Sequence, residues 1–158
     1  MMSLCSEVLR TLAGKSLVTA ESCTGGGIGA QLTAVPGSSA VYKGGIICYS
    51  NWVKEHILGV DGHTLEELGP VSAPVAKAMA EGACRVLKAD VSVSVTGLAG
   101  PGGDEYGNEA GTVFVGCSAG GKSWVREHHF AGDRESVRLQ AAEAALRLIL
   151  EIEKGEVV

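Results

Sequence analysis

Aromatic residues, prolines and long apolar runs are all scarce in this sequence of 158 residues. Phe, Trp and Tyr together make up 4% of the chain, and there are four prolines. No apolar run approaches the ~18 residues that a membrane-spanning helix needs, so we expect no such helix. The chain begins MMSLCSEVLR, without a basic start followed by an apolar stretch. We therefore expect no secretory signal and a cytoplasmic location.

Metal-binding patterns are also missing. The five cysteines contain no CxxC pair, and the four histidines are scattered along the chain. Cysteines of this kind are typical of reduced thiols in a cytosolic protein, and histidines spaced in this way make a poor metal site. We therefore expect neither a bound metal nor another cofactor.

Positive charge is too sparse for a nucleic-acid-binding protein. The formal net charge is −5, and the 13 Lys and Arg residues form no basic stripe. Hydrophobic residues make up 46% and charged residues 20%, which are the proportions of a globular chain rather than of a disordered one. We therefore expect a folded domain without a nucleic-acid partner.

The apolar pattern predicts helices alternating with strands, followed by a strand hairpin and a last helix. Helices are predicted over residues 3–13, from Ile28 to a stop before Pro36, from an Asn51 cap to Leu58, from a Ser72 cap through Val86, and from an Asp133 cap through Ile152. Strands are predicted over residues 16–21, 45–50, 90–96, 112–119 and 122–130, the last two joined by Gly120-Gly121. This order predicts a single domain over residues 1–158 with an α/β fold, a three-layer α/β/α sandwich around a mixed sheet of about five strands.

Glycine, in contrast, is abundant. The chain has 23 glycines in 158 residues, which is about twice average usage. Most of them fall in two segments, residues 25–45 and 97–121, and each segment begins where a predicted strand ends. Ligands of open α/β sheets bind outside the carboxyl ends of the strands, so two such loops side by side predict one ligand site. The alternative for either loop is that its glycines only relieve tight turns.

The first of these loops, SCTGGG, offers three possible nucleophiles: Ser22, Cys23 and Thr24. It is neither a Walker A sequence nor a proper GxGxxG loop. Gly25 and Gly26 leave backbone N–H groups uncovered near a predicted helix N-terminus, where such donors suit an oxyanion or a phosphate. Spacing alone does not choose among the three nucleophiles.

A nucleophilic hydroxyl needs a base, and Lys54 is placed better than any histidine. His128 and His129, for example, are neighbours on one predicted strand and point to opposite faces. Behind an Asn51 cap, Lys54 would sit in the first helical turn, where the helix dipole lowers the pKa of an amine and partial burial acts in the same direction. The alternative is an ordinary exposed lysine.

Three further side chains are candidates for the same site. Arg134 directly follows the Asp133 cap, where its charge opposes the helix dipole. A phosphate or carboxylate ligand that pairs with the guanidinium would remove that conflict. The alternative is an ion pair between Arg134 and the neighbouring Asp133 or Glu135. Thr96 ends the valine-rich strand just before Gly97, so its hydroxyl should face the crevice. Tyr49 would add another hydroxyl, with simple strand packing as the alternative.

Six short motifs carry a resemblance to a known family. In chain order they are AESCTGG (20–26), YSN with a lysine three residues further on (49–54), GPVS (69–72), TGLAGPGG (96–103), GTV (111–113) and AGDR (131–134). On these motifs the sequence resembles the CinA C-terminal domain family, from about residue 4 to residue 152.

The resemblance implies hydrolysis of the carboxamide of nicotinamide mononucleotide (NMN) in pyridine-nucleotide recycling. The products are nicotinate mononucleotide and ammonia, and the implied mechanism uses serine and lysine without a metal. Ser22 is then the nucleophile, Lys54 the general base, and Tyr49 assists this pair. We expect the substrate to contact the residues around them: Cys23, Thr24, Gly25, Gly26, Thr96, Gly97 and Arg134.

Two other functions stay open at this stage. One is a non-catalytic nucleotide- or phosphate-binding module that uses the same glycine-rich loops. The other is a thiol amidase with Cys23 as nucleophile, which is weaker because no histidine is placed to pair with that thiol. We also expect a homo-oligomer, because the pockets of such small domains are often completed by a neighbouring copy.

Overall fold

The structure, a computed structural model, describes residues 1–157 and is built around one five-stranded sheet; Val158, the last residue of the predicted domain, lies outside the described residues. The strand order is β2-β1-β3-β4-β5. β1 pairs in parallel with β2 and β3, whereas β4 pairs antiparallel with β3 and β5. The strands are β1 (Leu17–Glu21), β2 (Tyr42–Ile47), β3 (Val91–Gly97), β4 (Thr112–Ala119) and β5 (Lys122–His129). The predicted mixed sheet is confirmed.

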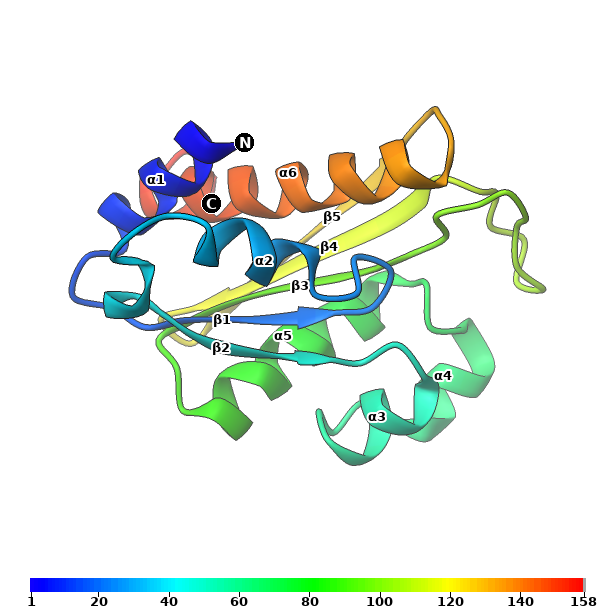
Figure 1. The fold of residues 1–158 in the computed structure, drawn as a ribbon. Coiled ribbons are helices and arrows are strands. Elements are labelled where there is room, and N and C mark those ends of the chain that lie inside the picture. Colours follow the sequence, from blue (N-terminus) through cyan, green and yellow to red (C-terminus); the bar gives the residue numbers. More distant parts are fainter. Residues whose placement is uncertain (158) are drawn as a thin grey trace.

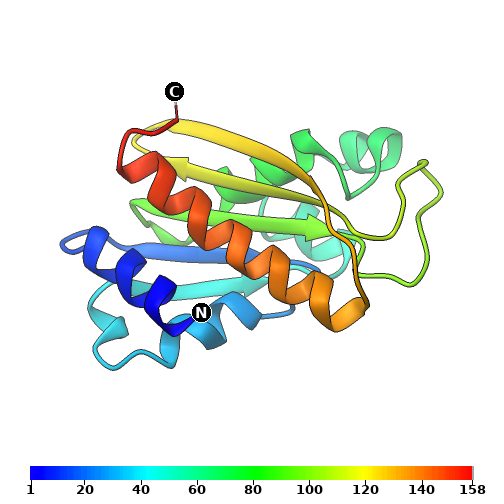
Figure 2. The same cartoon turned by 90° about the horizontal axis from the view of Figure 1, so that it is seen from above.

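Helices cover both faces of this sheet (Figure 1). One face carries α1 (Met2–Thr11), α2 (Gly27–Thr33) and α6 (Arg134–Glu153). Figure 2 shows α6 lying along the sheet with α1 beside it. The opposite face carries α5 (Ala73–Leu87), with α3 (Asn51–His56) and α4 (Gly62–Leu68) at one end. A 3-10 turn, η1 (Ser38–Ala40), precedes β2. The predicted three-layer α/β/α architecture is confirmed.

The alternating valines and serines of β3 explain how α5 packs against the sheet. The three valines of this strand lie in the core beneath α1 and α6. Ser92 and Ser94 face α5 and donate hydrogen bonds to the carbonyls of Ala80 (2.5 Å) and Ala76 (2.6 Å). Because these hydroxyls find partners on the helix backbone, they are buried without the penalty of an unsatisfied polar group. β3 is therefore buried on both faces.

Two local predictions need correction. The second strand covers Tyr42–Ile47 rather than residues 45–50, because the chain leaves the sheet at Cys48 to reach α3. The N-cap of α3 is Ser50, whose Oγ accepts from Val53 N–H at 3.3 Å, and Asn51 is already helical. In addition, α4 was not predicted; it has seven residues and an Asp61 cap.

Other local predictions are confirmed. Ser72 occupies the N-cap position of α5, and Asp133 caps α6 by accepting from Ser136 N–H at 2.9 Å. Gly120 and Gly121 join β4 to β5 with φ angles of +60° and +79°, a region that glycine enters without steric cost. Within residues 1–157, no helix combines the length and the apolar character that crossing a bilayer requires.

Candidate active site

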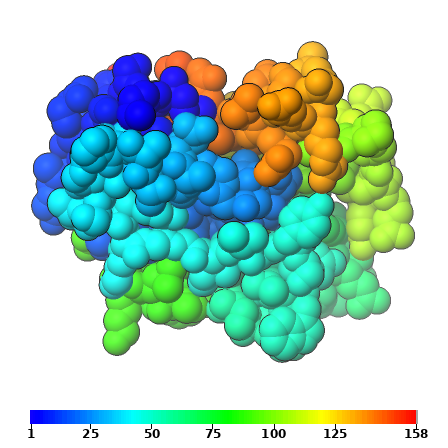
Figure 3. Space-filling model, in the orientation of Figure 1, coloured from blue at the N-terminus to red at the C-terminus, as the bar shows by residue number. Residues whose placement is uncertain are grey.

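The carboxyl ends of β1 and β3 open onto a pocket of about 300 Å³. The loop after each strand contributes to its lining, as expected for an open α/β sheet. In Figure 3 the start of α6 (orange) meets the segment around α3 (cyan-green) at the surface near this end of the sheet. The residues that line the pocket are Ser22, Cys23, Tyr49, Asn51, Lys54, Pro70, Val71, Thr96, Gly97, Leu98, Ala99, Gly100, Gly102 and Arg134.

Lys54 and Ser22 meet in this pocket. Lys54 Nζ lies 2.9 Å from Ser22 Oγ. The amine also donates to the carbonyl oxygens of Cys48 (2.8 Å) and Tyr49 (3.4 Å). The side chain of Lys54 is 1% exposed, so the alternative of an ordinary surface lysine is wrong.

Burial lowers the pKa of Lys54 below its ordinary value, because a buried amine loses the hydration that stabilises its charged form. A neutral amine has two N–H bonds and one lone pair. The carbonyls of Cys48 and Tyr49 take the two N–H bonds, and the lone pair is then available to the hydroxyl of Ser22. This arrangement is the one a general base requires.

The loop after β1 holds Ser22 at the floor of the pocket. Ser22 N–H donates to Val95 O at 3.0 Å, which continues the pairing of β1 with β3 by one residue. The chain then turns sharply at Gly25 and Gly26, whose φ angles are +58° and +98°. An L side chain is strained in this region, so these two glycines are required by the turn itself. α2 begins immediately afterwards.

Thr24, Gly25 and Gly26 are not among the residues that line the pocket, so their contact with the substrate stays a prediction. The hydroxyl of Thr24 donates to the carboxylate of Glu21 at 2.8 Å. Gly25 N–H donates to Ser22 O at 3.1 Å, so it is not a free donor for an oxyanion. These three residues shape the loop, whereas Cys23 reaches the pocket wall. Within residues 1–157, the N–H of Cys23 donates to no backbone carbonyl.

Arg134 joins two segments at the pocket mouth. Its Nη1 donates to Gly100 O at 2.7 Å, and its Nη2 donates to Tyr49 Oη at 3.3 Å. Neither contact is the local pair with Asp133 that the sequence allowed. Tyr49 is 64% exposed, so strand packing does not explain it. Thr96 Oγ1 donates to Pro70 O at 2.8 Å and is buried at the inner wall.

Cys23 is poorly suited to be the nucleophile. Burial raises its pKa to about 11, which leaves the thiol protonated near neutral pH. Burial raises the pKa of the neighbouring Cys48 to about 11 as well. In the part of the chain that the structure describes, no cluster of three or more His, Cys, Asp or Glu side chains is arranged to hold a metal ion.

Two residues that the sequence analysis missed hold the Ser22 loop. Glu21 lies directly before Ser22 and accepts hydrogen bonds from the loop and from α2. Arg138, on α6, donates to the carbonyls of Cys23 (3.0 Å) and Thr24 (3.2 Å). The sequence contains a signal for Glu21: it is a carboxylate at the end of an apolar strand. A charged residue buried at such a position needs hydrogen-bonding partners.

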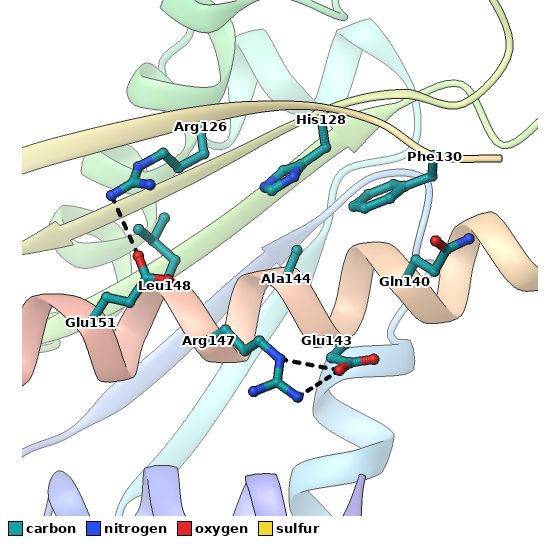
Figure 4. Close-up of a pocket in the computed structure, with 9 residues that line it drawn as sticks. All are labelled: Arg126, His128, Phe130, Gln140, Glu143, Ala144, Arg147, Leu148 and Glu151. Atoms are coloured by element: carbon teal, nitrogen blue, oxygen red, sulfur yellow. Dashed lines mark hydrogen bonds and ion pairs between the residues drawn. The ribbon is translucent and has the colours of Figure 1, made fainter. Parts of the chain in front are cut away.

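A second groove, of about 330 Å³, lies between β5 and α6 (Figure 4). Its charged groups are already paired: Arg126 lies 3.4 Å from Glu151, and Arg147 lies 2.7 Å from Glu143. His128 stacks on Phe130 in this groove, and burial lowers the pKa of its imidazole. This histidine therefore lies on another part of the molecule from Ser22, which agrees with the preference for Lys54 as base.

Comparisons with known proteins place the chain among CinA proteins. Residues 2–152 match the profile of the CinA C-terminal domain. A "CinA-like protein" of Mycolicibacterium vanbaalenii is 44% identical over 144 residues, which are 90% of this chain and 34% of that protein. A "Putative competence-damage inducible protein" of Bacillus subtilis is 42% identical over 139 residues, 88% of this chain and 33% of that protein. The chain spans about a third of the length of these curated relatives.

Solved structures agree in fold. A CinA superfamily protein from Escherichia coli is 37% identical with a TM-score of 0.93, and the match covers 96% of this chain and 89% of that one. One from Klebsiella pneumoniae is 34% identical with a TM-score of 0.94, and the match covers 98% of both chains. With the family profile matched over nearly its whole length, the chain belongs to the CinA C-terminal domain family.

Proposed function

We propose that this chain hydrolyses the carboxamide of nicotinamide mononucleotide to nicotinate mononucleotide and ammonia. The observation that carries the proposal is the contact of 2.9 Å between Lys54 Nζ and Ser22 Oγ in a pocket at the strand ends. A hydroxyl beside a buried amine of lowered pKa is the arrangement of an activated nucleophile. The substrate itself comes from the resemblance to the family rather than from the geometry.

In the first half of the reaction, neutral Lys54 accepts the proton of Ser22 while Oγ attacks the amide carbon. The tetrahedral intermediate collapses as Lys54 returns this proton to the amide nitrogen, and the C–N bond breaks to release ammonia. An ester between Ser22 and the nicotinoyl group remains. In the second half, Lys54 takes a proton from water, the hydroxide attacks the ester, and the proton returns to Ser22 Oγ. The acid is released and the enzyme is restored.

The groups around the pair have separate roles. Cys23 N–H follows the nucleophile directly and donates to no backbone carbonyl. It would donate to the oxyanion, an interaction worth about 3 kcal/mol. Arg134 has further N–H groups beyond those used by Gly100 and Tyr49, and these would bind the phosphate of the substrate at the pocket mouth. Tyr49 Oη, which accepts from Arg134, would assist in orienting the substrate.

One set of measurements distinguishes the proposed amidase from the alternative of a non-catalytic nucleotide-binding module. Ammonia release from NMN is measured for the wild type and for Ser22→Ala, Lys54→Ala and Cys23→Ala. We expect turnover by the wild type and by Cys23→Ala, and loss in the other two. Binding of NMN without turnover by the wild type would favour the module. Activity that survives Ser22→Ala and is lost in Cys23→Ala would favour a thiol amidase.

A further inference from the structure

Glu21 is a buried carboxylate that the proposed reaction does not use. It ends β1, directly precedes Ser22, and is 2% exposed. Its two oxygens accept four hydrogen bonds from three segments of the chain. Oε1 accepts from Thr24 Oγ1 and Ile28 N–H, each at 2.8 Å; Oε2 accepts from Thr19 Oγ1 at 3.0 Å and Gly29 N–H at 3.1 Å.

The pattern of donors requires a carboxylate at this position. Ile28 and Gly29 each present a backbone N–H, which can only donate, to a different oxygen of Glu21. Both oxygens must therefore be acceptors. A glutamine of the same size has one acceptor oxygen, so its NH₂ group would face one of these two N–H groups. A buried donor left without an acceptor destabilises the folded chain.

The four bonds connect Ser22 to structure on both sides. Thr19 belongs to β1, Ile28 and Gly29 belong to the first turn of α2, and Thr24 lies within the loop. The N-cap of α2 is Gly26, which has no side chain to bond this turn, so Glu21 supplies the acceptors instead. The loop between Ser22 and α2 is thus fixed at both its ends and at its middle.

We infer that Glu21 is a positioning residue that holds the loop so that Ser22 Oγ stays within reach of Lys54. This inference rests on the proposed role of Ser22 as nucleophile. A shift of about 1 Å in a reacting group can reduce a rate about 100-fold. A positioning residue should therefore affect kcat far more than KM, because the substrate-binding groups at the pocket mouth are not attached to it.

The test uses two reactions of Ser22. The first is NMN hydrolysis. The second is covalent labelling by a small alkyl fluorophosphonate, in which Ser22 Oγ bonds to phosphorus, fluoride leaves, and Lys54 takes the hydroxyl proton. Labelling is followed by intact-protein mass and needs no pyridine nucleotide. A wild type that is labelled at Ser22 but does not hydrolyse NMN would refute the proposed substrate while leaving the role of Glu21 open to measurement by labelling.

Three variants are compared with the wild type by both reactions, with far-UV circular dichroism and a thermal melt as controls of folding. For Glu21→Gln we expect kcat and the labelling rate to fall together by about 100-fold, with KM within about threefold of the wild type. Thr24→Val keeps the shape of its side chain and removes one of the four bonds, so we expect a fall of about tenfold. Ser92→Ala removes a buried hydrogen bond on β3 and should leave both rates unchanged.

A folded Glu21→Gln that is labelled at the wild-type rate would overturn the inference. If Glu21→Gln does not fold, Thr24→Val decides: a reduced labelling rate supports the inference, and an unchanged rate overturns it. An equal loss in Ser92→Ala would show that rates follow general stability rather than the loop, which also overturns it.

Discussion

Lys54 Nζ lies 2.9 Å from Ser22 Oγ although 32 positions separate the two residues in the chain. The contact forms because β1 and β2 are parallel neighbours, so the loop after β1 and the helix after β2 start at the same edge of the sheet. Cys48 and Tyr49, in the connection from β2 to that helix, direct their carbonyls to the amine. The sheet topology thus brings a base to a nucleophile.

The rate of NMN hydrolysis should rise with pH through the titration of Lys54. The base must be neutral, and burial lowers the pKa of its amine below the ordinary value of about 10.4. The expected profile of kcat/KM therefore rises to a plateau with a midpoint below that value. Lys54→Arg keeps the cation but removes the base, and should reduce kcat by about 10²–10⁴-fold at every pH. A flat wild-type profile from pH 6 to 10 would argue against Lys54 as base.

The free energy of unfolding should also depend on pH through the titration of Lys54, and the direction of this dependence can be derived. The unfolded chain binds a proton to Lys54 up to about pH 10.4, whereas the folded chain releases it at lower pH. The unfolded state therefore holds more protons between the two pKa values, and this residue makes the free energy of unfolding rise with pH in that window.

Lys54→Met removes this titration and leaves all others in place. Urea unfolding of both proteins at pH 7 and pH 10 isolates the effect of Lys54. The free energy of the wild type minus that of Lys54→Met should increase from pH 7 to pH 10. A constant or decreasing difference would mean that the pKa of Lys54 is not lowered in the folded state.

Gly26 and Gly27 are neighbours with opposite expected responses to alanine. Gly26 has a φ of +98°, so Gly26→Ala should lower the free energy of unfolding by about 1–2 kcal/mol. Gly27 is the first residue of α2, and an added Cβ would meet its nearest atom at 4.0 Å. Gly27→Ala should therefore raise the free energy of unfolding by about 0.4–1 kcal/mol. Urea titrations measure both, and destabilisation by Gly27→Ala would contradict the loop geometry.

Arg134 should discriminate substrates by their phosphate. A hydrogen bond to a charged group contributes about 1.5–3 kcal/mol, so Arg134→Met should raise KM for NMN by roughly 10–100-fold. With nicotinamide riboside, which lacks the phosphate, the same variant should change KM by less than about threefold. Equal losses for both substrates would mean that Arg134 only links Gly100 to Tyr49 and does not bind the phosphate.

The local sequence predicts the parts of the site that depend on neighbouring residues. An apolar strand followed by SCTGGG predicts a strand-to-helix turn with Ser22 at the sheet edge, and the structure has this turn. Glycine at positions 25 and 26 predicts a positive φ, which both adopt. The cap at Asp133 likewise follows from local hydrogen-bonding chemistry. These features need no knowledge of distant segments.

The burial of a side chain is harder to predict from neighbouring residues, because burial depends on segments far away in the chain. The burial of Lys54 follows from the parallel pairing of β1 with β2, which brings the start of α3 to the loop that carries Ser22, and no local pattern records it. Glu21 was missed for another reason: its donors lie nearby in the chain, on β1, the loop and α2, but they meet its carboxylate only once the turn between β1 and α2 has formed. The hydroxyl of Thr24, a residue predicted to contact the substrate, donates to this buried carboxylate. α4 was missed because seven residues carry too little apolar periodicity.

The most direct test of the account is whether the acyl group of the substrate is transferred to Ser22. The protein is mixed with NMN, quenched in acid at millisecond times, and digested for mass spectrometry. We predict the mass of nicotinate mononucleotide less one water on the peptide that contains Ser22, and neither this adduct nor ammonia release in Ser22→Ala. An adduct on Cys23, or turnover by Ser22→Ala at the wild-type rate, would contradict the serine–lysine mechanism.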